Sequence, residues 1–312
     1  MEEVYNLEFP SWCTEFTIFG YVFRRVEEYR ERVLSLQNWI SAHHEFGFEP
    51  NIGVHAITAY VERPDKEEES VLPWGGDRKH SALNDVLLLL SMFTRRDVFL
   101  RETSIHGLDA ALYHDPRLHP GGGLLRVSVP YKAATRNTDG IFYPYEIGFG
   151  DGLSTVYQLI RSDHWQKKFA NGALLFLARD AFGSYGLESQ FVQCWTIWEH
   201  VFALHNQAWL GREDIERMSA REKIAFVLVE YGFSEQVARH RQLSTLATIR
   251  NRLVHFGRFP ETTDPFSLMN QVRLFINLTE LLIAKILGLS ASNVLNTQEK
   301  WDEFLETGTV PE

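Results

Sequence analysis

Residues 243–257, LSTLATIRNRLVHFG, carry the pattern on which the predicted fold depends. Large apolar residues recur there every three or four positions, and at about 100° per residue they fall on one side of an α-helix. This apolar stripe consists of Leu243, Leu246, Ile249, Leu253 and Phe256. Asn251 and His255, four residues apart, share a neighbouring polar face. Gly257 is the expected C-cap of the helix, because glycine readily adopts the left-handed conformation that ends many helices.

Helical periodicity extends over the second half of the chain. From about residue 151 onward, glycine and proline become sparse and apolar residues recur with a period of about 3.6. The expected helices lie near 152–169, 171–182, 186–206, 219–231, 235–256 and 266–287. The sequence therefore predicts an all-α helical bundle over residues 151–312.

The first half of the chain has a different pattern. Short runs of β-branched and aromatic residues alternate with glycine, proline and acidic turns, which is typical of strands. We expect strands at 16–23, 54–61 and 124–130, and helices at 27–40 and 81–93. The predicted fold class is therefore α+β, with a mixed α/β region at 1–150 that senses or binds a partner. A stretch rich in Gly and Asp, 136–152, marks the boundary with the bundle.

The charge of the chain limits its partners. The 312 residues carry a formal charge of −10, from 41 Asp and Glu against 31 Lys and Arg, so nucleic acid is repelled overall. Residues 236–260 are an exception, because they contain five arginines and no acidic residue. These are Arg239, Arg241, Arg250, Arg252 and Arg258. A polyanion would therefore bind at this segment.

Cysteine content and hydropathy favour a cytoplasmic protein without a membrane partner. Cys13 and Cys194 are the only cysteines, which argues against a disulfide framework and a structural zinc site. The most apolar run, 86–93, is far shorter than the roughly 20 residues that cross a bilayer. The histidines lack the spacing of metal ligands, so we expect neither a metal nor a cofactor.

Two interpretations of the arginine segment follow from the residues alone. In the first, Arg250 and Arg252 are solvated or paired with acids of a neighbouring helix, and His255 is an ordinary residue at a helix end. In the second, Arg250 and His255 act together on a phosphate group. Five residues separate them by about 140° around an ideal helix, so they do not face each other. The second interpretation therefore requires a distorted helix end or a second copy of the site.

The string from Ile249 to Gly257 resembles the R-x4-6-H signature of the HEPN superfamily, the higher eukaryotes and prokaryotes nucleotide-binding domain. The upstream segment is similar to the companion helix of such domains through Phe191, Trp195, Trp198, Glu199 and Phe202. The resemblance covers about 150–290. It implies a metal-independent endoribonuclease in which Arg250 and His255 act at the cleaved phosphate and Asn251 orients them. Glu199 and His200 could line the same cleft. RNA is the implied substrate, and three further arginines of the segment are expected to bind it, namely Arg241, Arg252 and Arg258.

The resemblance also implies a homodimer, because superfamily members usually pair through their signature helices. Residues 82–91 resemble N-terminal regions of bacterial antiphage defence proteins. We therefore expect a toxin-like effector that a protein trigger or inhibitor controls.

Two other functions stay open. A HEPN-like scaffold would bind a nucleotide or a protein without catalysis. A metal-dependent nuclease would instead bind Mg²⁺ through Asp65 and Asp77 and activate water with Lys79. The second alternative predicts that EDTA abolishes activity.

Overall fold

The computed structural model describes much of the chain. The described residues are 1–7, 9, 13–29, 31–32, 57–74, 80–94, 98–100, 151–169, 172–183, 187–206, 210–261, 264–289 and 295–309. The predicted strand at 124–130, most of the predicted helix at 27–40 and nearly all of the predicted boundary at 136–152 lie outside these ranges.

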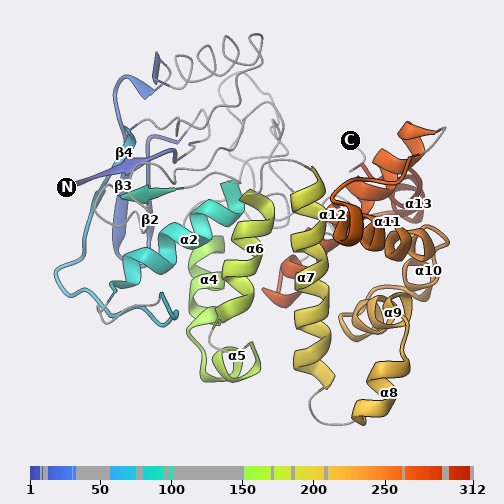
Figure 1. The fold of residues 1–312 in the computed structure, drawn as a ribbon. Coiled ribbons are helices and arrows are strands. Elements are labelled where there is room, and N and C mark those ends of the chain that lie inside the picture. Colours follow the sequence, from blue (N-terminus) through green and yellow to red (C-terminus); the bar gives the residue numbers. More distant parts are fainter. Residues whose placement is uncertain are drawn as a thin grey trace.

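An antiparallel sheet forms the N-terminal part of the described structure (Figure 1). Its strands are β1 (Glu2–Tyr5), β2 (Glu15–Ile18), β3 (Tyr21–Arg25), β4 (Ile57–Glu62) and β5 (Phe99–Leu100), in the order β2-β3-β4-β1-β5. The prediction for 54–61 is confirmed over the part that β4 covers. We did not expect β1 and β5, because four and two residues are too short for a recognisable period.

The single strand predicted at 16–23 is wrong, because this segment is a hairpin. Phe19 and Gly20 have φ angles of 49° and 84°, as in a type I′ turn, and they reverse the chain between β2 and β3. The rings of Phe16 and Phe23 then stack across the two strands with centroids 5.0 Å apart. The aromatic residues on both sides of Gly20 favour a strand, so the sequence pattern did not indicate this turn.

Helix α2 (Ala82–Thr94) confirms the predicted helix at 81–93. Its residues from Ala82 to Phe93 are all buried, as expected for a helix that is apolar on every side. The buried carboxylate of Asp85 accepts hydrogen bonds from Ser70 Oγ, from Val71 N at 2.9 Å and from Trp74 Nε1 at 2.8 Å. These bonds fix the preceding loop against the first turn of the helix.

The described residues after 150 are helical. The helices are α4 (Asp151–Ile160), α5 (Asp163–Lys168), α6 (Ala173–Gly183), α7 (Leu187–Asn206), α8 (Arg212–Arg217), α9 (Ala220–Glu230), α10 (Glu235–Ala238), α11 (Leu243–Phe256), α12 (Pro265–Ile286) and α13 (Gln298–Thr307). The α+β class, with a sheet followed by helices, is therefore confirmed. Two predicted helices are wrong in length, because 152–169 divides at Ser162 and 235–256 divides at 239–242. We did not expect α8 and α13.

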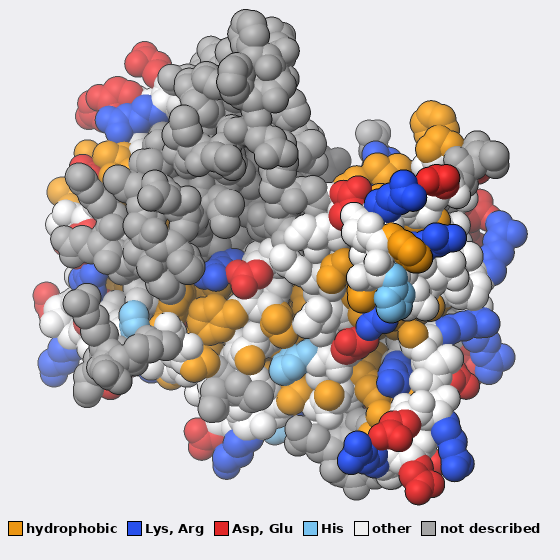
Figure 2. Space-filling view, viewed as in Figure 1, with side chains coloured by type: hydrophobic (Ala, Val, Ile, Leu, Met, Phe, Trp, Pro, Cys, Tyr) orange, Lys and Arg blue, Asp and Glu red, His pale blue; other side chains and the backbone are white. Residues whose placement is uncertain are grey.

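A continuous hydrophobic core joins the sheet to the helices. Helix α2 packs against α4 and α6, and α7 packs against α6, α9, α11 and α12 (Figure 1). Within the described ranges, none of the helices combines the length and the hydropathy that crossing a bilayer requires. On the face in Figure 2, charged side chains of both signs alternate with apolar ones over the C-terminal helices.

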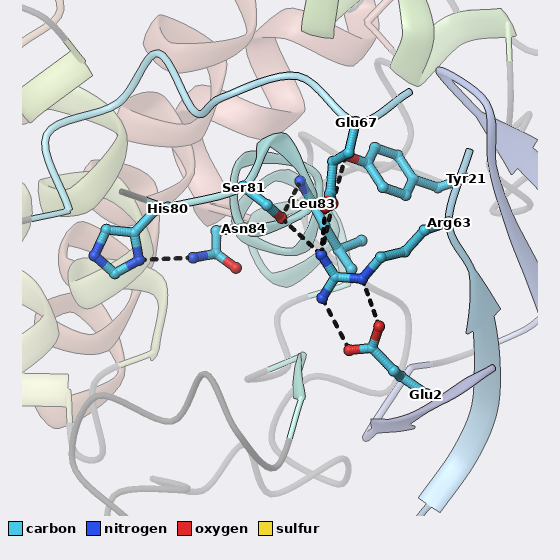
Figure 3. A network of polar contacts seen from close by, with 8 residues as sticks. All are labelled: Glu2, Tyr21, Arg63, Glu67, His80, Ser81, Leu83 and Asn84. Carbon is cyan, nitrogen blue, oxygen red and sulfur yellow. Dashed lines mark hydrogen bonds and ion pairs between the residues drawn. The ribbon is translucent and has the colours of Figure 1, made fainter. Parts of the chain in front are cut away.

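A network around Arg63 fastens the sheet to the start of α2 (Figure 3). The Arg63 guanidinium donates to both carboxylate oxygens of Glu2 on β1, to Glu67 at 2.7 Å and to Ser81 Oγ at 3.3 Å. Tyr21 OH on β3 donates to the same Glu67 at 3.1 Å. Residues that are far apart in sequence are thereby held together where strands β1, β3 and β4 begin or end.

Candidate functional site

A pocket of about 140 Å³ lies among helices α7, α9 and α11. It is lined by Trp195, Trp198 and Glu199 of α7, by Ala220, Lys223 and Ile224 of α9, and by Ala247, Arg250 and Asn251 of α11. The two tryptophans and Ile224 are buried, whereas Glu199 and Asn251 are exposed. The pocket therefore combines an apolar floor with a polar and charged rim.

The apolar stripe of α11 positions Arg250 at this rim. Four members of the stripe are buried, namely Leu243, Leu246, Ile249 and Leu253. Phe256 belongs to the same stripe but is 62% exposed, and its ring lies against the Arg252 guanidinium, whose carbon is 5.1 Å from the ring centroid. Helical periodicity predicts the side of the helix on which a side chain lies, but it does not determine whether another element packs against that side chain.

Arg250 is held in place by three neighbours. Its guanidinium carbon lies 5.8 Å from the centre of the Trp195 ring, and Nη1 donates to Asn251 Oδ1 at 3.2 Å. Nη2 lies 3.5 Å from Glu199 Oε1, which also accepts a hydrogen bond from Trp195 Nε1 at 2.8 Å. The expectation that Glu199 lines the same cleft as Arg250 is confirmed, whereas His200 is not among the residues that line the pocket. The Arg250 side chain keeps 32% exposure, so solvent still reaches it.

His255 is not part of this pocket. It is exposed in the last turn of α11, where its ring centroid lies 6.4 Å from that of Phe256. The helix stays regular through Phe256 and ends at Gly257, whose φ of 66° confirms the predicted C-cap. Because α11 has no distortion that would turn His255 toward Arg250, one chain alone does not bring the two residues together.

Three of the five arginines have carboxylate neighbours, so the segment 236–260 is less basic than its composition predicts. Arg239 pairs with Glu235 at 3.1 Å, and Arg258 pairs with Glu261 at 3.2 Å. Both acids lie immediately outside the segment, where the count of charges did not include them. Arg241 and Arg252 are exposed, with no ion pair to any residue that the structure describes.

The metal-nuclease alternative cannot be placed on the structure, since Asp77 and Lys79 lie outside the described residues. Among the residues that are described, no three His, Cys, Asp or Glu side chains come together in a way that could hold a metal ion. The side chains of Cys13 and Cys194 are both buried.

Folding, rather than sequence proximity, brings α9 to the site. Lys223 contributes an ammonium group to the pocket, and its Nζ lies 5.6 Å from the centre of the Phe202 ring. Nothing in the spacing of residues linked Lys223 to Arg250, because α9 and α11 are separated by two turns and α10.

Comparisons with known proteins add no family to these observations. No family model matches the chain, and no curated protein and no solved structure matches it either.

Proposed function

We propose that the protein is a metal-independent endoribonuclease with a composite site. Arg250 and Asn251 of one copy would act together with His255 of a second copy. The observation that carries this proposal is the placement of Arg250 at the rim of a pocket, in contact with Asn251 and open to solvent, on a regular helix. Because the end of α11 is regular, the His255 ring of the same chain does not reach the Arg250 guanidinium. A second copy of the protein would supply the imidazole instead.

The proposed chemistry needs only these side chains. The ribose 2′-hydroxyl attacks the adjacent phosphorus, the bond from phosphorus to the 5′-oxygen breaks, and a 2′,3′-cyclic phosphate and a 5′-hydroxyl result. Arg250 stabilises the charge that builds on the phosphate oxygens, because a guanidinium stays protonated and can donate two parallel hydrogen bonds. His255 accepts the proton of the 2′-hydroxyl or supplies one to the leaving oxygen. Asn251 holds the guanidinium in orientation.

Exposed apolar side chains beside His255 support pairing between copies. Val254 is 52% and Phe256 is 62% exposed, and both lie in the same helical turn as His255. Burying such side chains against a second copy would contribute favourable free energy, at about 25 cal/mol per Å² of apolar surface. Arg241, Arg252 and Arg258 are then the proposed contacts to the RNA backbone.

The cellular role that we propose rests on the resemblance to antiphage defence proteins. A nuclease of this kind would act on RNA in the cytoplasm as a toxin-like effector. Residues 1–150 would bind a protein trigger or inhibitor, because uncontrolled RNA cleavage would harm the host.

The test is cleavage of single-stranded RNA in the presence of EDTA. We expect the native protein to leave 2′,3′-cyclic phosphate ends, and Arg250→Ala and His255→Ala each to lose about a hundredfold or more in rate. Arg212→Ala, which removes an arginine far more exposed than Arg250, is the matched control and should cleave normally. Equal cleavage by all four proteins would overturn the catalytic assignment, as would the absence of cleavage.

Complementation tests the composite site directly. In a heterodimer of Arg250→Ala and His255→Ala chains, one of the two sites keeps both residues. Coexpression of the two variants should therefore restore about a quarter of the native rate if subunits pair at random. Failure to restore any activity, with dimers present, would show that each chain works alone.

A second candidate function is a non-catalytic module that binds a nucleotide. The ion pair between Arg250 and Glu199 favours it, since a guanidinium with a carboxylate neighbour already has a structural role. Binding of RNA without cleavage, unchanged by His255→Ala, would support this function.

A further inference from the structure

We propose that the pocket among α7, α9 and α11 binds one cytosine base of the RNA, with Glu199 accepting from the base and Asn251 donating to it. This inference rests on the proposed function, because it names the base that the nuclease prefers beside the cleaved phosphate. It would make Glu199, Asn251 and Lys223 determinants of specificity.

The size of the pocket limits the ligand to one ring. A cavity of roughly 150 Å³ accommodates benzene, and sites for drug-sized ligands begin near roughly 300 Å³. The pocket, at about 140 Å³, therefore admits a single six-membered ring and leaves the attached sugar and phosphate outside. A pyrimidine that belongs to a strand satisfies this limit, whereas a purine is too large.

The floor of the pocket suits the flat face of a base. Trp195 and Trp198 are 4% and 2% exposed and line the pocket together with Ile224. The small side chains of Ala220 and Ala247 line the same pocket. Proteins that bind single-stranded RNA commonly hold an unstacked base against such aromatic and apolar side chains.

The rim offers one acceptor and one donor to the edge of the base. Glu199 Oε1 is occupied by Trp195 Nε1 and Arg250, but Oε2 has no hydrogen bond to any residue that the structure describes. Asn251 accepts from Arg250 through Oδ1, so its Nδ2 amino group remains available as a donor. Arg250 therefore holds the two groups side by side along the rim, in defined orientations.

These two groups match the edge of cytosine. Its exocyclic N4 amino group would donate to Glu199 Oε2, as carboxylates commonly accept from this group, and its O2 or N3 would accept from Asn251 Nδ2. Uracil presents a carbonyl oxygen where cytosine has the amino group, so that oxygen would face the carboxylate and be repelled. The pocket should therefore discriminate between the two pyrimidines.

Lys223 and Arg250 place positive charge where the backbone would leave the pocket. Lys223 forms no ion pair with a residue in the described part of the chain, and Arg250 is only partly compensated by Glu199. An ammonium and a guanidinium at the rim suit the phosphates on either side of the bound nucleotide.

The experiment measures binding of RNA that cannot be cleaved. Fluorescein-labelled 2′-O-methyl hexanucleotides, one all-uridine and one with a single central cytosine, are titrated at low salt with EDTA and followed by anisotropy. We expect the native protein to bind the cytosine oligomer about tenfold more tightly. In Glu199→Gln this ratio should fall to about one, because the glutamine amide can donate to the uracil carbonyl as well as accept from cytosine.

Two further variants separate filling of the pocket from loss of the fold. Ala247→Leu places a larger side chain in the pocket and should abolish the preference for cytosine. Thr248→Leu, which introduces the same side chain at the adjacent exposed position of α11, should preserve it. Three outcomes would each overturn the proposal. The native protein could bind the two oligomers equally well, or it could bind neither. The third is a preference for cytosine that survives both Ala247→Leu and Glu199→Gln.

The result is independent of cleavage, because methylation removes the 2′-hydroxyl nucleophile. A preference for cytosine without nuclease activity would leave this site standing and overturn the nuclease. Cleavage of RNA without a preference for cytosine would support the nuclease and overturn the base-binding site.

Discussion

Two histidine rings of the helical region have a buried nitrogen without a hydrogen-bond partner in the described structure. They are His200 on α7, through Nε2, and His240 between α10 and α11, through Nδ1. Burial lowers the pKa of both rings below the usual value of 6.5, and the charge of Arg241 lowers that of His240 further. The unfolded chain therefore binds protons at these rings more readily than the folded protein does.

The consequence is a loss of stability in mild acid. Because the folded pKa values are depressed, the free energy of unfolding should fall as the pH is lowered from about 7.5 to about 5.5. The double variant His200→Gln/His240→Gln should show a shallower dependence than the native protein, measured by urea unfolding at several pH values. The exposed ring of His164 offers a matched control, since His164→Gln should keep the native slope. Identical slopes in all three proteins would contradict this prediction.

At the scale of residues, the sequence identified one side of the site but not the other. Arg250, Asn251 and Glu199 were recognised because a motif and its companion helix place them on two neighbouring helices. Lys223 was not, because its helix reaches the pocket only through tertiary packing. The charge of segment 236–260 was overestimated for a similar reason, as Glu199 approaches Arg250 from 51 residues away.

Among the elements, two helices end in glycines of nearly the same backbone conformation but different surroundings. Gly257 ends α11 with a φ of 66°, and no atom lies within 4 Å of the position that a Cβ would occupy. Gly308 ends α13 with a φ of 69°, but a Cβ there would lie 2.2 Å from the Asn270 carbonyl oxygen on α12. The Gly308 carbonyl also accepts a hydrogen bond from Asn277 Nδ2 at 2.7 Å.

The two glycines should therefore differ in their tolerance of alanine. Gly257→Ala costs only the strain of the left-handed conformation, about 1 kcal/mol of unfolding free energy. Gly308→Ala adds a steric clash with the α12 backbone, for a total of roughly 2–5 kcal/mol. Urea unfolding followed by far-ultraviolet circular dichroism measures both, and equal losses would show that α13 does not pack on α12 as described.

The divisions between elements were harder to predict than the elements themselves. The apolar period predicted α2, α7 and α12 well, because their buried faces are long. The breaks at Ser162 and at 239–242 contain neither glycine nor proline, so the commonest signals for a helix end are missing, although Ser162 does cap α5 by accepting a hydrogen bond from Trp165 N.

At the scale of the whole molecule, the proposed site exists only in a dimer. Val254 and Phe256 are the exposed apolar residues on either side of His255. If they form the contact between copies, a charge at this position should separate the copies and also abolish cleavage.

We expect Phe256→Glu to weaken self-association by at least about tenfold, because the contact would bury an unpaired carboxylate. Val229→Glu changes an apolar residue of similar exposure, 56%, on α9 and should leave association unchanged. Sedimentation velocity over a range of protein concentrations distinguishes the two. A native protein that stays monomeric, or a Phe256→Glu variant that associates normally, would contradict the composite site.

The two hydrophobic patterns of the sequence, one typical of strands and one of helices, predicted the α+β class. They did not predict how the two parts pack together. Helix α2 lies within the first 150 residues, yet it packs against α4 and α6. The guanidinium of Arg161, at the end of α4, also donates to the Glu69 carbonyl oxygen at 3.3 Å and contacts Glu68. Such contacts depend on the path of the chain in space, which hydrophobic periodicity does not describe.

The strand order of the sheet has a consequence for how the protein folds. β2 and β3 are joined by a two-residue turn, so their pairing closes a very short loop. β1 lies between β4 and β5, whose residues follow it by more than 50 and more than 90 positions. Because long loops close at a greater cost in entropy, we expect the hairpin to form early and the first strand of the chain to be among the last to find its partners.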